Sequence, residues 1–197
     1  MAAHVVSVSR DETHRFSKEP CASITLVEGM GVAGDAHAGA VVQHRSRVRR
    51  GPDQPNLRQV HLIHDEILDE ARAAGHNVGP GSLGENILTR GLDLLSLATG
   101  TRLLIGGTVL RVTGLRNPCR QINRYSAGLL KIVLTRDDSV AASSAGTLRA
   151  SVARESFDGV VRKAGVMAVV DRGGEVRPGD SIKVRLPDEP HRPLAPV

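Results

Sequence analysis

The segment GLRNPCRQIN, residues 114–123, holds the side chains whose types and spacing best suit chemistry. Cys119 follows Pro118, which fixes its own backbone torsion and favours an extended residue before it, so the thiol lies on a restricted segment. Arg116 and Arg120 flank Cys119, and a nearby cation favours the thiolate, the form that ligates metals or attacks electrophiles. A second interpretation stays open here, because most free cysteines are small buried apolar residues.

Two Gly-containing segments carry further polar groups. GMGVAGDAHAG contains Asp35 and His37, and its Gly spacing matches neither a Walker A loop nor the dinucleotide fingerprint, so nucleotide binding of those types is not expected. GPGSLGENILTR places Glu85 and Asn86 after a Gly–Pro–Gly turn. A carboxylate beside an amide can orient a ligand or donate a proton; the alternative is a polar turn that caps a strand.

A cluster of arginines follows the first of these segments. Arg47, Arg49 and Arg50 are interpreted as part of a solvated basic loop. His44 and Arg45 come immediately before them and close to the Gly-rich segment in sequence, which makes this pair candidate ligand-binding residues.

Composition predicts a β-rich protein with one domain. The chain has 197 residues, with 21 Gly and 10 Pro, which implies many turns and few long helices. We expect a single domain over residues 1–186 and a Pro-rich tail over residues 187–197 that runs irregularly along the surface. The core must be built from Val, Leu, Ile and Ala, because the chain has two Phe, one Tyr and no Trp.

Short alternating runs predict the strands that position these residues. One hairpin turns at Gly106 and Gly107, and its second strand leads into Arg116, so Cys119 is expected just beyond a strand end. His61 and His64 would point to opposite faces of a strand, which argues against a two-histidine metal site. The expected strands are residues 3–9, 23–28, 56–63, 87–89, two or three within 92–115, 165–170 and 181–186.

One helix is expected at residues 65–75, with Asp65 as its N-cap and Gly75 beyond its end. Its apolar side chains, Ile67, Leu68 and Ala71, would pack on the sheet. Residues 122–134 are interpreted as a turn and a short helix, and the Ser/Ala/Gly-rich residues 135–151 as a flexible insertion.

Net charge and cysteine content limit the classes of partner and the compartment that we expect for this protein. A net charge of +5 and a pI near 9.9 suit an anionic ligand, nucleic acid or an acidic membrane surface. Single-strand binders usually stack bases on aromatic rings, which this chain almost lacks, so a small phosphorylated or carboxylated ligand fits better, although duplex backbone binding is left open. The sequence shows no disulfide framework, signal peptide or membrane-spanning run, so a cytoplasmic protein without a membrane partner is expected.

The order of GDxHxG at residues 34–39, GENI at 84–87, GLRNPCRQI from Gly114, and the closing GVMAVV…GGEVRPGDSIKV resembles a MOSC domain, the molybdenum cofactor sulfurase C-terminal domain, as a stand-alone bacterial-type protein. The resemblance covers about residues 3–186 and is looser at residues 40–60. The sequence departs from the family pattern at residues 138–151, a segment that is longer and richer in Ser and Ala. It implies a mainly β fold, a MOSC-type β-barrel with a few peripheral helices.

The resemblance also implies a site for the pyranopterin molybdenum cofactor, with Cys119 bonded to molybdenum. A thiolate is a suitable soft ligand for a transition metal. Arg forks and loop amides suit the terminal phosphate of the cofactor. The cofactor-binding candidates are Asp35, His37, His44, Arg45, Arg58, Asn86, Arg116, Asn117 and Gln121.

Family members with known activity resemble reductases of N-hydroxylated compounds, which implies a small N-hydroxylated substrate and a separate electron-donor reductase protein. Glu85 or His61 is then the candidate proton donor, because removal of oxygen as water requires protons. Asn86 and Gln121 would orient the cofactor or the substrate. Three alternatives remain: a sulfur carrier with a persulfide on Cys119, a non-catalytic cofactor carrier, and a nucleic-acid-binding barrel, the last disfavoured by the missing aromatic residues.

Overall fold

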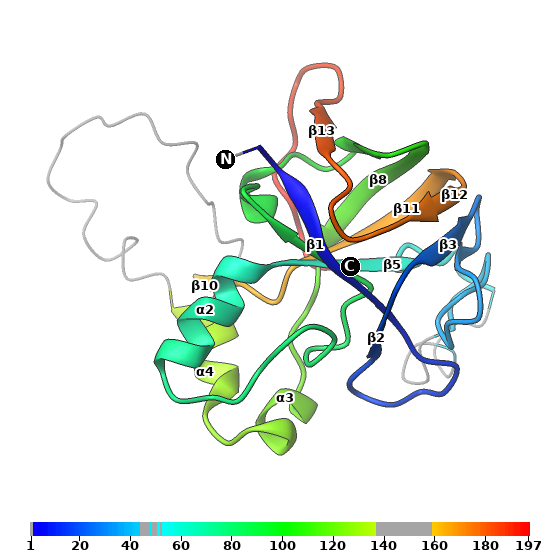
Figure 1. Cartoon of the computed structure of the whole chain (residues 1–197). Coiled ribbons are helices and arrows are strands. Elements are labelled where there is room, and N and C mark those ends of the chain that lie inside the picture. The colour runs from blue at the N-terminus through cyan, green and yellow to red at the C-terminus, as the bar shows by residue number, and fades with distance from the viewer. Residues whose placement is uncertain (1, 44–47, 49–50, 52, 137–158) are drawn as a thin grey trace, which may run out of the picture.

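A curled eight-stranded sheet forms the body of the protein (Figure 1). The computed structural model describes residues 2–43, 48, 51, 53–136 and 159–197. The strands lie in the order β13-β7-β8-β11-β5-β6-β1-β2. Their bounds are β1 His4–Arg10, β2 Glu19–Cys21, β5 Val60–His64, β6 Ile87–Arg90, β7 Arg102–Ile105, β8 Thr108–Leu115, β11 Val166–Arg172 and β13 Ile182–Arg185.

The sheet curls until β1 meets the start of β13, as the right-handed twist of strands allows. His4 forms an isolated antiparallel bridge with Ser181, and the Ile182 amide donates to the Ala3 carbonyl at 2.9 Å. Neighbouring strands are antiparallel except β5 and β6, which are parallel and joined through helix α2 (Asp65–Ala73). The structure therefore confirms the predicted mainly β fold with few helices, in the form of a half-barrel.

The two faces of the sheet pack on different apolar clusters. One face fills the main core, which includes Val8, Leu62, Leu110, Ala168 and Ile182. The other face packs against α2, α3 (Gln121–Tyr125) and α4 (Leu129–Val133), through residues such as Ile63, Leu68, Leu88, Ile122 and Val133. These three helices lie together on one side of the molecule in Figure 1. Both clusters consist almost entirely of aliphatic side chains, as the aromatic-poor sequence requires.

Two small sheets complete the described part of the fold. β12 (Gly174–Val176), β3 (Ile24–Val27) and β4 (Gly31–Val32) form one, and β10 (Val160–Arg162) pairs with β9 (Leu134–Arg136) in the other. The sequence did not predict β2, β4, β9, β10 or β12, because runs of two or three residues show no usable alternation. Part of the region expected to be a third strand is instead a 3-10 turn, Leu94–Ser96.

Three local expectations need correction. Residues 56–59 precede the strand rather than belong to it, and residues 122–134 hold parts of two short helices. Asp65 is the first helical residue rather than the N-cap: His64 occupies the cap, without a side-chain hydrogen bond. The Asp65 carboxylate does not cap the helix; it forms ion pairs with Arg72 and Arg90. Ile67, Leu68 and Ala71 are buried as expected.

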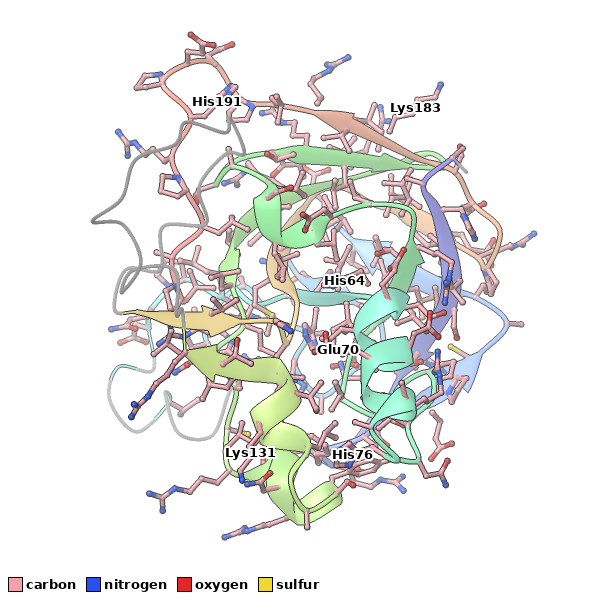
Figure 2. All side chains as sticks on the ribbon, turned by 90° about the vertical axis from the view of Figure 1, so that its left-hand side faces the viewer. His64, Glu70, His76, Lys131, Lys183 and His191 are labelled. Carbon is pink, nitrogen blue, oxygen red and sulfur yellow. The ribbon has the colours of Figure 1, made fainter. Side chains whose placement is uncertain are left out.

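The C-terminal segment, residues 187–197, is irregular as expected but is partly built into the fold. Leu194 is buried in the main core, and the Leu115 amide donates to the Ala195 carbonyl at 2.8 Å. Figure 2 shows His191 of this segment at the same end of the molecule as Lys183 of β13. The expected flexible insertion lies, from residue 137 onward, outside the described residues. Among the helices described, none has the length and apolar character needed to cross a membrane.

Candidate functional site

A bulge in β8 directs Arg116 toward the site. Val112 pairs with Ala168 and Gly114 pairs with Met167, so Thr113 is the extra residue. Such a bulge turns the following side chains to the opposite face of the sheet. The residues before it, such as Leu110 and Val112, face the main core, whereas Arg116 after it lines a cavity.

The floor of this cavity contains Met167, His61 and Asn86, which belong to one row across the sheet. Gly114 pairs with Met167, and Met167 pairs with His61. Asn86, just before β6, extends the row, because its amide nitrogen donates to the His61 carbonyl at 2.8 Å and its side-chain oxygen accepts from the His61 amide at 3.2 Å. Residues distant in sequence thus meet through strand register.

The cavity has a volume of about 510 Å³ and an electropositive lining. Among the described residues, four cationic side chains line it, those of Arg15, Lys18, Arg58 and Arg116, and no Asp or Glu does. The remaining lining residues are Phe16, His37, Gln43, Gln54, Asn56, His61, Gly84, Asn86, Asn117, Pro118, Cys119, Gln121 and Met167. A cavity with this charge suits an anionic ligand.

Cys119 lies at the exposed edge of the cavity, just beyond the end of β8. Its Sγ lies 3.4 Å from Oε1 of Gln121, the first residue of α3. Asn117 accepts a hydrogen bond from Arg162 Nε at 3.3 Å. The other thiol, Cys21 on β2, is half-buried, does not line the cavity, and has Sγ 3.6 Å from the Val8 carbonyl.

Arg116 is a buried cation with an incomplete set of partners. Its residue exposure is 9%, and Nη1 has no hydrogen-bond partner in the part of the chain that the structure describes. Burial lowers the pKa of Arg116, and the nearby Cys119 and Glu85 only partly offset that effect. The guanidinium lies 5.9 Å from the centre of the Phe16 ring. Buried polar groups are normally hydrogen-bonded, so this guanidinium is suited to receive an anion.

Lys18, which lines the cavity, forms a buried ion pair with Asp35, which lies behind the cavity wall. Lys18 Nζ lies 2.6 Å from Asp35 Oδ2, and Asn86 Nδ2 donates to the same oxygen at 2.9 Å. The other oxygen, Oδ1, accepts from the His37 amide at 2.9 Å and lies 3.2 Å from His37 Nδ1. Burial alone would raise the pKa of Asp35, but hydrogen bonds from His37 and the charge of Lys18 outweigh it and hold that pKa well below its usual range.

Glu85 supports the cavity wall from behind. It is 0% exposed, and its two oxygens accept from the amides of Gly81 and Leu83. Gly81 has a φ of +78°, and a Cβ there would lie 2.0 Å from the Lys18 carbonyl, so this turn requires glycine. Burial raises the pKa of Glu85, against the effect of these hydrogen bonds. Its neighbours Gly84 and Asn86 line the cavity, whereas Glu85 does not.

His61 lines the cavity as a buried residue. Its Nε2 lies 2.8 Å from the Ala164 carbonyl, so in the neutral ring this nitrogen carries the proton and donates it. Burial, with the charge of Arg116, lowers the pKa of His61 well below its usual value. The ring is therefore neutral at physiological pH, and the cavity gains no positive charge from it.

The structure brings most of the sequence-predicted site residues together. Eight of them line one cavity: His37, Arg58, His61, Asn86, Arg116, Asn117, Cys119 and Gln121. Asp35 lies directly behind the cavity through His37 and Asn86, as does Glu85 through the Gly81 turn. His44 and Arg45 fall outside the described residues. Arg58 is held by the Val197 carbonyl, which lies 3.1 Å from its Nη1.

Sequence reasoning missed Lys18, Phe16, Asn56 and Met167. Phe16 and Lys18 lie in a charged segment between the expected strands 3–9 and 23–28. Nothing in the pattern of that segment indicates that the Lys18 ammonium is buried. Met167 could have been found from the expected strand 165–170, since alternation places it on the opposite face from Val166 and Ala168.

The fold and the cavity together define a β-rich protein in which one exposed thiol lies at the edge of a cavity lined by cationic side chains. The chain belongs to the MOSC domain family, whose model matches residues 32–183. That family is associated with molybdenum cofactor binding. The family predicted from the sequence is therefore confirmed.

Solved structures share the fold. The YuaD protein of Bacillus subtilis is 24% identical, with a TM-score of 0.68 over 95% of this chain and 98% of that one. YiiM of Geobacillus stearothermophilus is 14% identical (TM-score 0.57, 93% and 75% of the two chains), and YiiM of Escherichia coli is 19% identical (0.56, 98% and 73%). No curated protein matched the sequence.

Proposed function

We propose that the cavity binds the pyranopterin molybdenum cofactor and that the protein reduces N-hydroxylated compounds. The observation that carries the proposal is the pairing, at one cavity, of an exposed thiol with a buried guanidinium whose Nη1 lacks a partner. Cys119 would ligate the metal, and Arg116 would bind the cofactor's anionic end. Family membership supports the choice of cofactor.

The residues present fit such a group. No set of three or more His, Cys, Asp or Glu side chains able to hold a metal occurs within the described residues. A metal in this cavity would therefore arrive with organic ligands of its own and take one soft ligand, the Cys119 thiolate, from the chain. Arg116 and Arg58 offer guanidinium forks for a phosphate, which that geometry binds well.

Reduction of an N–OH group to N–H consumes two electrons and two protons and releases water. When bound, the cofactor would supply the redox-active metal for this change. His61 is the proton-donor candidate that lines the cavity, and its Nε2 proton is donated to the Ala164 carbonyl in the ligand-free protein. Because the ring is neutral, transfer of that proton to a substrate would have to be coupled to uptake of a proton at Nδ1, so the ring would act as a relay. Glu85 is the second candidate, but it does not line the cavity, so its proposed contribution is to hold the Gly81 turn behind the cavity.

Asn86 and Gln121 would orient the bound groups in different ways. Asn86 is hydrogen-bonded to Ser9, His61 and Asp35, so it presents a fixed surface at the cavity floor. Gln121 contacts Cys119 Sγ at the cavity edge. Its amide can therefore hold the thiol on the cavity side.

The persulfide alternative also has an observation in its favour, because an exposed Cys119 leaves room for an added sulfur atom. Electrospray mass spectrometry of the freshly purified protein would detect that sulfur. A persulfide on Cys119 together with no bound molybdenum would favour a sulfur carrier over a reductase. A non-catalytic carrier would retain molybdenum yet turn over no substrate.

The reductase proposal is tested by turnover of a hydroxylamine or amidoxime by protein purified from a host that makes the cofactor, with dithionite and methyl viologen as the electron source. We expect the amine or amidine product, formed in proportion to bound molybdenum. His61→Gln is expected to slow turnover while it retains the metal. Molybdenum-loaded protein that leaves every N-hydroxylated compound unchanged would contradict the reductase assignment.

A further inference from the structure

The surface next to Cys119 carries three exposed cations. Lys183 and Arg185 on β13 are also exposed and have no side-chain partner among the described residues, but Lys183 lies at the opposite end of the molecule from Lys131 (Figure 2). Arg120, Arg124 and Lys131 are exposed and have no hydrogen bond or ion pair through their side chains within the described residues. On the neighbouring helix α2 the pattern is different: Arg72 pairs with Asp65 and Asp69. Residues 94–136 contain no Asp or Glu at all.

Helix electrostatics disfavours only one of these cations, because Arg124 and Lys131 lie in the last turns of α3 and α4, where a positive charge is favourable. Arg120 is the N-cap of α3, next to the positive end of the helix dipole. Arg124 follows four residues later, which puts two like charges on one side of a single turn. The two guanidinium groups therefore concentrate positive charge on one side of α3.

An exposed aromatic ring lies among them. Tyr125, the only tyrosine of the chain, is 41% exposed on α3. Its ring packs 5.7 Å from Phe16, and Phe16 lies beneath Arg116 and lines the cavity. Tyr and Arg are the residue types enriched at energetic centres of protein interfaces.

The surface is held rigidly. Tyr125 Oη lies 3.0 Å from Ser82 Oγ, and His76 Nδ1 lies 2.7 Å from Ser126 Oγ. Asn123 Oδ1 accepts from the Leu130 amide at 2.9 Å, which ties α3 to α4. A preorganised surface loses little conformational freedom when a partner binds.

We propose that Arg120, Arg124, Tyr125 and Lys131, here called the α3–α4 surface, dock an acidic electron-donor protein. The proposal rests on the proposed reductase function, since a reductase with Cys119 at its metal must receive electrons near that residue. α3 starts two residues after Cys119, so a donor on this surface stands beside the site. Complementary charge then raises the association rate and orients the encounter.

The test compares two double variants with equal loss of charge. Arg124→Glu/Lys131→Glu alters the α3–α4 surface, and Lys183→Glu/Arg185→Glu alters β13. Figure 2 shows Lys131 and Lys183 at opposite ends of the molecule. The probe is flavodoxin, a small acidic electron carrier, and its binding is measured by titration at low and at physiological ionic strength without any turnover.

We expect wild-type binding to weaken as salt rises, about a tenfold loss of affinity in Arg124→Glu/Lys131→Glu, and a much smaller loss in the β13 variant. Equal losses in the two variants, or no binding by the wild type at low salt, would overturn the proposal. Selective loss of binding to a duplex DNA fragment, with flavodoxin binding unchanged, would assign the surface to nucleic acid instead.

A second measurement, of turnover, distinguishes a failure of the docking proposal from a failure of the proposed reductase function. Turnover driven by dithionite needs no docked protein, so all variants should match the wild type in that assay. No dithionite-driven turnover in any form would defeat the reductase function. Dithionite-driven turnover together with flavodoxin-driven turnover that is equally fast in both variants would defeat only the docking surface.

Discussion

Arg116 shows at the scale of one residue how function can oppose stability. A guanidinium that is buried without a full set of partners destabilises the ligand-free protein, yet the same guanidinium is preorganised to bind an anion. If its role is to bind the cofactor, its removal should stabilise the empty protein and weaken cofactor retention together.

We therefore expect Arg116→Met to raise the free energy of unfolding of the cofactor-free protein by about 1–3 kcal/mol, since an apolar side chain of similar size replaces a buried charge. The same variant should retain less cofactor. Urea unfolding and cofactor content measure the two effects, and the exposed Arg120→Met is the control. Destabilisation by Arg116→Met with unchanged cofactor content would make Arg116 a structural residue.

Unlike Arg116, the Lys18–Asp35 pair consists of buried charges that both have partners, so removal of either charge should lower the free energy of unfolding. Asp35→Asn should lower the free energy of unfolding by about 3–5 kcal/mol, because it leaves the Lys18 ammonium buried without a counter-charge. The double variant Lys18→Met/Asp35→Leu should recover much of that loss. Urea unfolding of the three forms provides the comparison, and a double variant no better than Asp35→Asn would contradict this account.

His61 gives an expected pH dependence. Its pKa is held well below the usual value in the folded protein, so below about pH 6.5 the unfolded chain binds a proton that the folded chain does not. The stability from neutral His61 is thus fully present above that pH. It is lost as the pH falls, at up to about 1.4 kcal/mol per pH unit. The difference in unfolding free energy between wild type and His61→Gln should therefore shrink between pH 7 and pH 5. A difference that does not change with pH would contradict the assignment of a lowered pKa to His61.

Sequence alone identified part of the site at this scale. Cys119 and Arg116 share a short segment with an unusual composition, so both could be found by inspection. Lys18 could not, because a lysine in a charged turn is usually solvated and only the tertiary structure shows that Asp35 lies 2.6 Å away. The distinction between Glu85 behind the cavity wall and Asn86 on its surface also required the structure.

At the scale of elements, β8 and the C-terminal segment act as a unit. The backbone of the C-terminal segment passes directly over Gly114 of β8. A Cβ at this position would lie 2.3 Å from the Ala195 carbonyl oxygen. Gly114→Ala should therefore displace residues 195–197 and destabilise the protein by about 1–3 kcal/mol.

A deletion provides the test for this contact. In protein shortened by residues 195–197, Gly114→Ala should have little further effect, because the clash is gone, and the two changes would then be strongly non-additive. Thermal or urea unfolding of the four forms gives the coupling energy. Additive effects would show that Gly114 is needed for a reason other than this approach.

Elements of four residues or more were largely predictable, and shorter ones were not. The hairpin of β7 and β8 followed from a Gly pair between two apolar runs, and Ile105 indeed pairs with Thr108. The bulge at Thr113 left no pattern in the sequence, yet it places Arg116 on the cavity side. β12 was not predicted, because Gly173 and Gly174 at its start interrupt any alternation of apolar residues.

At the scale of the whole molecule, aliphatic composition and frequent Gly predicted a mainly β protein, and the curled sheet confirms it. The family prediction came from several short motifs in the right order, and the match over residues 32–183 confirms it as well. The separation of paired cations on α2 from unpaired ones on α3 and α4 emerges only when ion pairs are seen in three dimensions.

The most direct test of the central claim, that Cys119 ligates molybdenum in this cavity, is elemental analysis of protein purified from a host that makes the cofactor. We expect about one molybdenum per chain in the wild type and in Cys21→Ser, because one soft thiolate serves one metal, and almost none in Cys119→Ser. Circular dichroism should show the same fold in all three. Molybdenum retained in folded Cys119→Ser, or absent from all three proteins, would contradict the account.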